Sequence, residues 1–296
     1  MPKLSILMPV YNEGSYIKEA LNSILAQSFT NFEAIVVDDG STDDTRVKAN
    51  YYASKDSRIT VLTHGKIGKN AALNLAFNSC KGEIIMFLAG DDILPEDSLQ
   101  SRVKAFEMSD PLTEKVSVHG HLKLYSKWPK YDGLVLPKKL QKGSSIGGAT
   151  TFSRALAKYI FPLPTCLPNE DTWSSLCVQC FAQKQVVIEP IVLFYRIHEG
   201  NARKKGLPFD ETNLALHERF IAYRLFLDQH EDELSFRNQK LLERRAKLEE
   251  FRYNGRICRI LSMSKISLED RLRALFYSNE RLYKFKVKFD RFFLGH

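Results

Sequence analysis

Apolar segments of strand length alternate with helical segments over about the first 90 residues, and this alternation limits the fold more than any other feature. The predicted strands are residues 4–10, 33–37, 58–62 and 83–88, and the predicted helices between them begin near residues 15, 41 and 69. Helices that connect successive strands produce a parallel sheet with helices on its faces. We therefore predict an α/β domain with a doubly wound sheet, in which ligands bind beyond the carboxyl ends of the strands.

Capping patterns mark two of these helix starts. Ser15 precedes apolar residues at helical spacing and is the predicted N-cap of the first helix. Ser41 and Asp44 resemble a capping box, which predicts that the second helix opens there.

Polar pairs stand where three of the predicted strands end. They are Tyr11-Asn12, Asp38-Asp39 and Asp91-Asp92. Ligand crevices of such sheets lie at the carboxyl ends of the strands, so we expect the three pairs to converge on one edge. Adjacent carboxylates repel each other unless a cation lies nearby, although Asp91-Asp92 taken alone is equally consistent with a solvated acidic turn.

Composition is that of an ordinary globular protein, with 44% hydrophobic and 26% charged residues. No apolar run approaches the roughly 18–20 residues of a membrane span, and the first residues lack the cleavage region of a signal peptide. Five scattered cysteines fit a reducing compartment better than a disulfide framework, and Cys177 and Cys180 are expected to be core-facing thiols rather than zinc ligands. We therefore expect a cytoplasmic protein.

Positive charge is concentrated at the end of the chain. The net charge is +8, and residues 252–296 contain eleven Lys and Arg residues against four acidic ones. The rest of the chain is close to neutral. A uniformly basic nucleic-acid-binding protein is therefore disfavoured, and a local anionic partner for the tail is favoured.

The character of the sequence changes near residue 206. Before that point we predict a strand over residues 116–125, a Gly- and Ser-rich loop that runs into a helix over 143–154, and a pair of apolar strands within 185–201. After it the sequence is charged, helical and poor in Gly and Pro. The predicted organisation is an α/β domain over residues 1–205 and a helical, basic extension over residues 206–296.

Five short motifs, in this order, resemble those of the family 2 glycosyltransferases of the GT-A fold. They are "PVYNEG", "DDGSTDDT", "AGDD", "NEDTW" and "YRIHEGN". Each motif alone is weak, but five at matching intervals over residues 1–205 are specific. The resemblance implies a GT-A type, Rossmann-like nucleotide-sugar-binding sheet. It also implies an inverting enzyme that moves a sugar from a nucleotide-diphosphate donor to a hydroxyl group of a glycan or lipid-linked acceptor.

The resemblance implies a divalent cation, Mn²⁺ or Mg²⁺, bound at the acidic pair. Asp92 would be the metal ligand, and Asp91 would reach the ribose or the waters of the metal. One departure is that Ala89 and Gly90 stand where many relatives have a further aspartate. This difference weakens the metal site or transfers a ligand role to His198, whose alternative role is to hydrogen-bond a carbonyl at a strand end.

The resemblance also implies a donor-binding segment after the first strand. Pro9, Val10 and Tyr11 would flank the base, and Asn12 belongs to the same segment. Asp39 would accept a hydrogen bond from a pyrimidine, which favours a UDP-sugar; the alternative is an acid favoured by a helix dipole. Lys69 stands at a helix start, where a cation gains nothing from the dipole, so we expect it to contact a donor phosphate.

The "NEDTW" motif carries the predicted catalytic base. Asp171 would take the proton of the acceptor hydroxyl, and Glu170 would orient the acceptor or Asp171. The alternative is that both acids only favour the start of a helix. Trp173 is either a platform for the sugar ring or a buried aromatic side chain.

Two other functions and two roles of the tail stay open at this stage. A sugar nucleotidyltransferase would show a glycine-rich phosphate loop, which "PVYNEG" does not match, and a non-catalytic nucleotide-sugar-binding partner subunit would not need Asp171. The basic tail either binds an anionic membrane surface, as a peripheral protein of surface polysaccharide synthesis would, or packs on the α/β domain or a second copy in a homodimer. The tail side chains concerned are Leu272, Leu275, Phe276, Leu282, Phe285, Phe289, Phe292 and Phe293.

Overall fold

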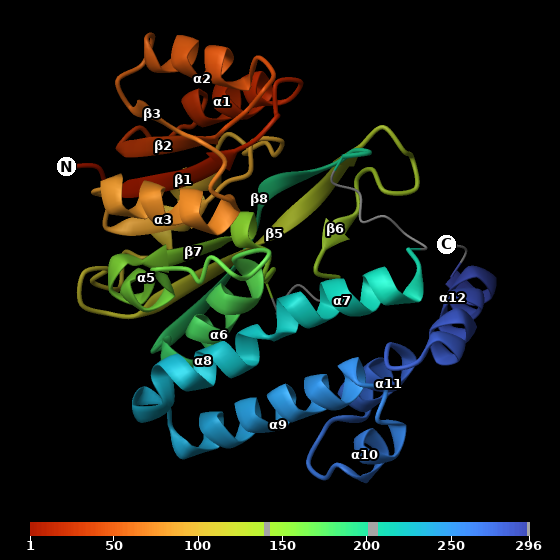
Figure 1. Ribbon diagram of the computed structural model, residues 1–296. Helices are drawn as coiled ribbons and strands as arrows, with labels where there is room; N and C mark the ends of the chain where they lie inside the picture. Colours follow the sequence, from red (N-terminus) through yellow and green to blue (C-terminus); the bar gives the residue numbers. More distant parts are fainter. Residues whose placement is uncertain (139–142, 201–206, 295–296) are drawn as a thin grey trace. The chain divides into compact units, whose positions relative to one another are not determined.

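The computed structural model describes residues 1–138, 143–200 and 207–294 (Figure 1). The chain divides into two compact units, Met1–Asn201 and Ala202–His296. Each unit is described here by itself. The boundary predicted between residues 205 and 206, and Asn201 of the last motif, lie outside the described residues.

Four parallel strands form the N-terminal half of the sheet in the first unit. They are β1 (Leu4–Val10), β2 (Phe32–Asp39), β3 (Ile59–His64) and β4 (Ile84–Phe87), paired in the order β3-β2-β1-β4. The strand order reverses at β1, because the chain runs outward through β2 and β3 and returns to the other side of β1 with β4. Ligands of such sheets bind at this reversal point, beside the carboxyl ends of β1 and β4. The predicted α/β fold is confirmed.

The second half of the sheet is mixed rather than parallel. It contains β5 (Val116–Ser126), β6 (Val135–Leu136), β7 (Thr150–Ser153) and β8 (Lys184–Ile197). The strand β7 pairs antiparallel with both β4 and β5, and β8 pairs parallel with β5. The sequence analysis assigned β7 to a loop, and it split β8 into two strands. Both assignments are wrong, because β7 is a short, fully buried strand and β8 continues through an irregular pairing near His121.

Helices of the first unit pack beside the sheet. They are α1 (Ile17–Leu25), α2 (Thr45–Ala53), α3 (Lys69–Ser79), α4 (Ser98–Lys104), α5 (Arg154–Ile160) and α6 (Asp171–Phe181), with a 3₁₀ turn η2 (Gly147–Ala149) before β7. The helix α3 packs on β1 and β2 (Figure 1). The helix α4 packs on β8. The apolar side chains of β1 and β4 are buried in the core between these elements.

Neither predicted serine cap is present. Tyr16, not Ser15, precedes α1, and Asp44 precedes α2; neither side chain caps its helix. The hydroxyl of Ser41 instead accepts a hydrogen bond from the backbone N–H of Asn12 at 3.0 Å. Ser41 therefore joins the loops after β1 and β2, which a capping pattern along the sequence does not reveal.

The second unit is helical. Its elements are α7 (Phe209–Phe220), α8 (Ala222–His230), η3 (Glu231–Glu233), α9 (Phe236–Tyr253), α10 (Ile257–Ser262), α11 (Leu268–Phe276) and α12 (Glu280–Leu294). Leu248, Ile260 and Ala274 form a small apolar core between α9, α10 and α11. None of the described helices is both long enough and apolar enough to cross a bilayer.

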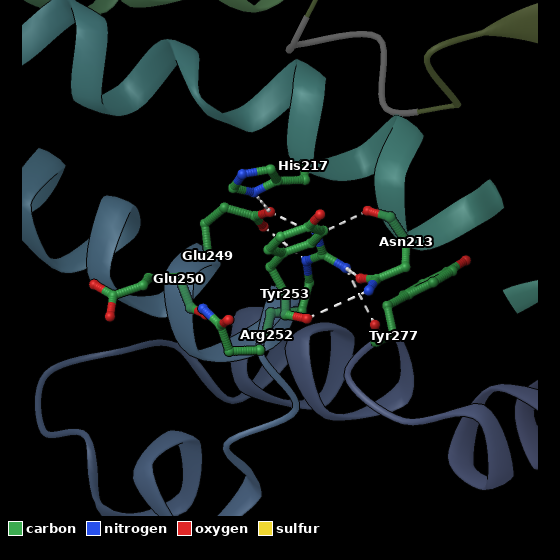
Figure 2. A network of polar contacts seen from close by, with 8 residues as sticks. Asn213, His217, Glu249, Glu250, Arg252, Tyr253 and Tyr277 are labelled. Atoms are coloured by element: carbon green, nitrogen blue, oxygen red, sulfur yellow. Dashed lines mark hydrogen bonds and ion pairs between the residues drawn. The ribbon is translucent and has the colours of Figure 1, made fainter. Parts of the chain in front are cut away.

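A buried ion pair ties these helices together (Figure 2). Arg252 of α9 donates two hydrogen bonds to the carboxylate of Glu249, at 2.6 and 2.7 Å, and both side chains are buried. The guanidinium also donates to the side chain and carbonyl of Asn213 in α7 and to the carbonyl of Tyr277 after α11. His217 lies 3.2 Å from Glu249. One arginine thus joins three segments of the unit.

Replacement of Glu249 by Gln is expected to destabilise the second unit by about 3–5 kcal/mol, because Arg252 then keeps a buried charge without its counter-ion. Hydrogen exchange of the backbone amides in α7 and α9 measures this loss. The matched control is Glu243→Gln on the same helix, where the Lys240–Glu243 pair is exposed and the expected change is about 0–1 kcal/mol. Equal effects of the two substitutions would contradict the role given to the buried pair.

Candidate active site

The loop after β1 is held in a fixed shape by the loop after β2. Asn12 has a positive φ of 54°, and its side-chain oxygen accepts a hydrogen bond from the backbone N–H of Thr42 at 2.8 Å. The backbone N–H of Gly14 donates to Asp43 at 2.9 Å. These bonds lie on both sides of Glu13, so they fix the direction in which Glu13 leaves the loop. Asn12, predicted as a donor-binding residue, has this bracing role in the structure.

The predicted base-binding residues Tyr11 and Asp39 meet through a lysine. Asp39 is buried and accepts hydrogen bonds from the backbone N–H groups of Ile67 at 2.6 Å and Gly68 at 2.9 Å. Lys66 pairs with Asp39 at 2.9 Å and places its ammonium group 3.0 Å from the centre of the Tyr11 ring. Burial would raise the pKa of Asp39, but its hydrogen bonds with Lys66 and the two backbone groups outweigh burial and lower it.

The two aspartates after β4 have different environments. Asp92 is 3% exposed, and its Oδ1 accepts a hydrogen bond from the backbone N–H of Arg196 at 2.9 Å. Burial, with the adjacent charge of Asp91, raises the pKa of Asp92 well above its usual range. Asp91 instead places its Oδ2 at 3.0 Å from Nε2 of His198. The predicted pair of Asp91 and Asp92 thus separates into an enclosed carboxyl and one that contacts His198.

Arg196 connects this acidic turn to the end of β8. Its Nε donates to the carbonyl of Asp91 at 2.7 Å, and its Nη2 donates to Glu19 of α1 at 2.7 Å. The sequence analysis gave Arg196 no role, although it lies within "YRIHEGN". The sequence contains one signal of this role, because Arg196 lies at the end of an apolar strand, two residues before His198. Arginine is rarely buried unless it is paired, so an arginine at such a position indicates a specific contact.

Glu170 and Asp171 lie at the start of α6 and contact two other segments. The Lys69 ammonium lies 2.8 Å from the Glu170 carboxylate, and the backbone N–H of Gly147 donates to Oδ1 of Asp171 at 3.2 Å. Burial would lower the pKa of Lys69, but Glu170, with Asp171 and Asp91, raises it. Lys69, predicted to contact a phosphate, therefore has Glu170 as its partner within the protein.

The charges near Tyr195 show that these acids gather at one place. Burial, followed by the charges of Asp92, Asp91 and Asp171, raises the pKa of the Tyr195 hydroxyl to about 12. The acids come from the end of β4 and the start of α6, nearly 80 residues apart in the chain. The pairs predicted to converge are joined by other contacts: Lys66 links Tyr11 to Asp39, and Gly90, before Asp91, lies against Glu13 of the loop after β1.

Glu13 adds a carboxyl that the sequence analysis did not single out. Burial, followed by the charges of Asp91 and Asp43, raises the pKa of Glu13 to about 7. A Cβ atom added at Gly90 would lie about 3.0 Å from the Glu13 side chain and 2.8 Å from Val10. Glycine at position 90 therefore lets the turn after β4 lie this close to Glu13.

Several polar and aromatic residues nearby have structural roles. Asn70 and Asn74 of α3 hydrogen-bond the carbonyls of Pro164 and Leu163 in the segment that leads to Glu170. Trp173 is 1% exposed and donates its indole N–H to the carbonyl of Ile160. Of the two roles considered for Trp173, these contacts favour a buried aromatic side chain over a platform for the sugar ring. Cys177 is a buried free thiol and Cys180 a partly buried one.

Two pockets flank the acidic residues. One of about 250 Å³ lies beside Asp171 and is lined by His119, Gly147, Phe152 and Ser175, among others. The other, of about 360 Å³, is lined by Tyr16, Tyr125, Arg196 and His198, with neighbouring backbone. There is thus space beside Asp171 and beside His198.

The donor atoms at this edge suit a hard divalent cation. A carboxylate oxygen of Asp91 and an imidazole nitrogen of His198 are already within 3.0 Å of each other, and both atom types bind Mn²⁺. Among the described side chains, no three His, Cys, Asp or Glu form a metal cage. Mg²⁺-type sites use one or two protein ligands together with substrate phosphates, so two ligands fit such an ion.

Relatives of known sequence are named glycosyltransferases. An uncharacterized glycosyltransferase of Nostoc is 28% identical over 218 residues, which is 67% of this chain and 66% of the Nostoc protein. An uncharacterized glycosyltransferase of Haemophilus influenzae is 37% identical over 122 residues, which is 41% of this chain and 47% of that protein. The chain thus spans less than two thirds of the length of these relatives.

Solved structures share the fold. S. aureus TarS, crystallised with UDP-GlcNAc, aligns with a TM-score of 0.63 at 20% identity, over 95% of this chain and 82% of TarS. The mannosyltransferase PcManGT from Pyrobaculum calidifontis, in complex with GDP-Man and Mn²⁺, aligns with a TM-score of 0.56 at 18% identity, over 98% of this chain and 88% of that one. The GT-A fold predicted from the motifs is confirmed.

The family model of glycosyl transferase family 2 matches residues 5–157, just over half of the chain. The match covers "PVYNEG", "DDGSTDDT" and "AGDD", three of the motifs on which the resemblance was based. The chain therefore belongs to glycosyl transferase family 2.

Proposed function

We propose that this chain transfers a sugar, with inversion, from a nucleotide-diphosphate donor to a hydroxyl group of a glycan or lipid-linked acceptor. The observation that carries the proposal is that the acids after β4 and the acid at the start of α6 lie at one edge of the sheet. Asp91 contacts His198, Asp171 begins α6, and both charges act on the same Tyr195 hydroxyl. A cation-binding group and a base on one edge are what displacement of a diphosphate requires.

The donor base would bind between Tyr11 and Asp39. Tyr11 follows β1 and Asp39 ends β2, at the edge where nucleotides bind in sheets of this kind. In the structure Lys66 covers the Tyr11 ring and pairs with Asp39, so a base stacking on Tyr11 would displace that lysine. A uridine donor is proposed from the carboxylate of Asp39, which accepts a hydrogen bond from a pyrimidine N–H; TarS was crystallised with UDP-GlcNAc.

Asp91 and His198 would hold the divalent cation, Mn²⁺ or Mg²⁺. The bound cation would stabilise the negative charge that develops on the leaving diphosphate. The choice of Asp91 rather than Asp92 follows from the contacts, since Asp92 is enclosed and already accepts the Arg196 N–H. Lys69, which pairs with Glu170 in the structure, would also contact a donor phosphate.

Asp171 would act as the general base. The acceptor oxygen forms a bond to the anomeric carbon while the bond from that carbon to the diphosphate oxygen breaks, and the acceptor proton passes to Asp171. The hydrogen bond from Gly147 keeps one oxygen of Asp171 fixed and favours the ionised carboxylate that can take the proton. A nucleotide-sugar-binding partner subunit without activity, or a nucleotidyltransferase, would not need this carboxylate.

Substitution of Asp171 by Asn is expected to lower the turnover number about 10²–10⁴-fold, because the base is lost while the donor site is kept. The measurement is release of nucleoside diphosphate from UDP-sugars in the presence of Mn²⁺, with donor affinity determined separately. Asp270→Asn is the matched control, since it also removes an acid from the first turn of a helix, in the second unit. Turnover near that of the wild type in Asp171→Asn would move the role of the base to another residue, with Glu170 next in line, whereas absence of turnover in the wild type would favour the binding-subunit alternative.

Substitution of Asp91 by Asn is expected to weaken Mn²⁺-dependent donor binding about tenfold or more, whereas Asp92→Asn should reduce stability with a smaller effect on metal affinity. The reason is that Asp91 contacts His198 while Asp92 holds the Arg196 backbone. Titration of Mn²⁺ by electron paramagnetic resonance, with UDP present, separates the two. Loss of metal affinity only in Asp92→Asn would assign the ligand role to Asp92, as the sequence analysis first expected.

Glu13 should make the first unit less stable as the pH rises. Its pKa is about 7 in the folded protein against an ordinary 4.5, so the folded state binds the proton more tightly than the unfolded chain does. Stability is therefore lost between about pH 4.5 and 7 and stays low above pH 7. In urea unfolding at pH 5 and pH 8, Glu13→Gln is expected to reduce the decrease by about 1–3 kcal/mol. An unchanged pH dependence would contradict the environment assigned to Glu13.

The second unit would attach the enzyme to an anionic membrane surface. Leu268 and Phe285 are 72% and 59% exposed, and the rings of Phe276, Phe285 and Phe289 form a row with centroids 6.5 and 6.4 Å apart. Lysines of α12 alternate with these rings along the helix. Exposed aromatics among basic residues favour acidic lipid, and such a surface would suit a lipid-linked acceptor. The side chains of Phe292 and Phe293 lie outside the described residues.

The double substitution Phe285→Ser and Phe289→Ser is expected to abolish binding to anionic vesicles, because it removes the apolar part of this surface. Co-sedimentation with vesicles of phosphatidylserine and phosphatidylcholine measures it, and wild-type binding should weaken as salt increases. Phe236→Ser, which removes a still more exposed aromatic side chain from α9, is the control. If the wild type does not bind at low salt, packing on protein or a homodimer becomes the better account of the tail.

A further inference from the structure

Arg102 of α4 is a fully buried cation with neutral partners. It is 1% exposed and donates to the carbonyl of Gly148 at 2.6 Å and to the hydroxyl of Thr151 at 2.7 Å. Further hydrogen bonds reach the carbonyl of Val192 and the hydroxyl of Ser98, both at 3.2 Å. Burial alone accounts for the lowering of its pKa to about 9, and no carboxylate in the described part of the chain offsets that loss.

Burial of Arg102 without a counter-ion among the described residues lowers the stability of the fold, so we expect this side chain to have a role that compensates for the loss. A charge taken out of water without a counter-ion is destabilising even when neutral groups hydrogen-bond it, and an apolar side chain of similar size is often the more stable alternative. The acceptors of Arg102 indicate this role. Gly148 belongs to the short η2 turn, and Thr151 and Val192 belong to the strands β7 and β8, which pack beside that turn.

That turn contacts both acids at the start of α6. Gly147, next to the carbonyl that Arg102 holds, donates its backbone N–H to Oδ1 of Asp171 at 3.2 Å. A Cβ added at Gly147 would lie 3.1 Å from Glu170 and 3.4 Å from Asp171. The turn therefore lies directly against the two carboxylates on one side, while Arg102 fixes it from the other.

We propose that Arg102 is a positioning residue for Asp171, acting through the η2 turn. The guanidinium fixes the Gly148 carbonyl and Thr151, and thereby holds the Gly147 N–H on the Asp171 carboxylate. Its catalytic consequence rests on the proposed function of Asp171 as the base. Its structural consequence does not, because a carboxylate that loses an N–H donor has a higher pKa whatever its role.

The test compares Arg102→Met with Arg154→Met. Arg154 is a matched control, because it too hydrogen-bonds backbone carbonyls, those of Gly82 and Cys80, which lie before β4 and not in the η2 turn. In Arg102→Met, ¹³C NMR of the Asp171 carboxyl should show a raised pKa, and the Gly147 amide resonance should move. The turnover number should fall about 10–100-fold with unchanged donor affinity, since a shift of about 1 Å in a reacting group can cost about 10². In Arg102→Met, the acidic limb of the pH profile of the turnover number should move to higher pH.

Arg154→Met should change neither the Asp171 pKa, nor the Gly147 amide resonance, nor the turnover number and its pH profile.

Thr151→Val keeps the test decisive if Arg102→Met does not fold. It removes one acceptor of Arg102 with little change of shape, so the same changes should appear, smaller in size. An unchanged Asp171 pKa and Gly147 amide in the folded variants would overturn the proposal, whatever the activity. A raised Asp171 pKa without any loss of turnover would instead support the positioning role and count against Asp171 as the base.

Discussion

The hydrogen bond from the backbone of Arg196 in β8 to Asp92 in the turn after β4 joins residues that are 104 positions apart in the chain, and the geometry of the site depends on it. It fixes the end of β8 against the turn after β4. With that turn held, Asp91 meets His198, and the Arg196 guanidinium can reach both the Asp91 carbonyl and Glu19. We therefore propose that Asp92 positions Asp91, and that Asp91 is the residue that would bind the cation.

Unfavourable charge is concentrated along this edge of the sheet. Burial, together with the charges of neighbouring acids, raises the pKa of Glu13, Tyr195 and Asp92, while Lys69 pairs with Glu170. Folded proteins tolerate such crowding where a bound ligand relieves it, and perturbed groups of this kind gather at functional sites. A divalent cation would supply positive charge where the acids are closest. A cation bound at the proposed metal site would therefore relieve the repulsion among these crowded acids.

The sequence predicted the parts of this molecule that local pattern determines. Apolar runs such as Leu4–Val10 are buried on both faces of the sheet, so they are legible as strands, and the motifs at their ends identified the family. Ser15 and Ser41 were assigned as caps because capping patterns are local, whereas Ser41 in fact bonds a loop from another strand. Asp91 contacts His198 and Asp92 accepts the Arg196 N–H, although the two residues are adjacent and identical. Their different partners come from distant parts of the chain, so the sequence pattern does not reveal them. Arg102 looks like an ordinary residue of a solvated helix, because its acceptors come from three distant segments.

The central claim is that one cation-dependent donor site lies at the ends of β1 and β4, with Asp171 beside it. A crystal structure of the chain with UDP and Mn²⁺, with the metal located by its anomalous scattering, tests this claim most directly. The account predicts a single metal peak bound by Asp91 and His198, with the diphosphate on its other side and the base against Tyr11 and Asp39. A metal bound elsewhere, or a nucleotide bound away from this edge, would contradict it.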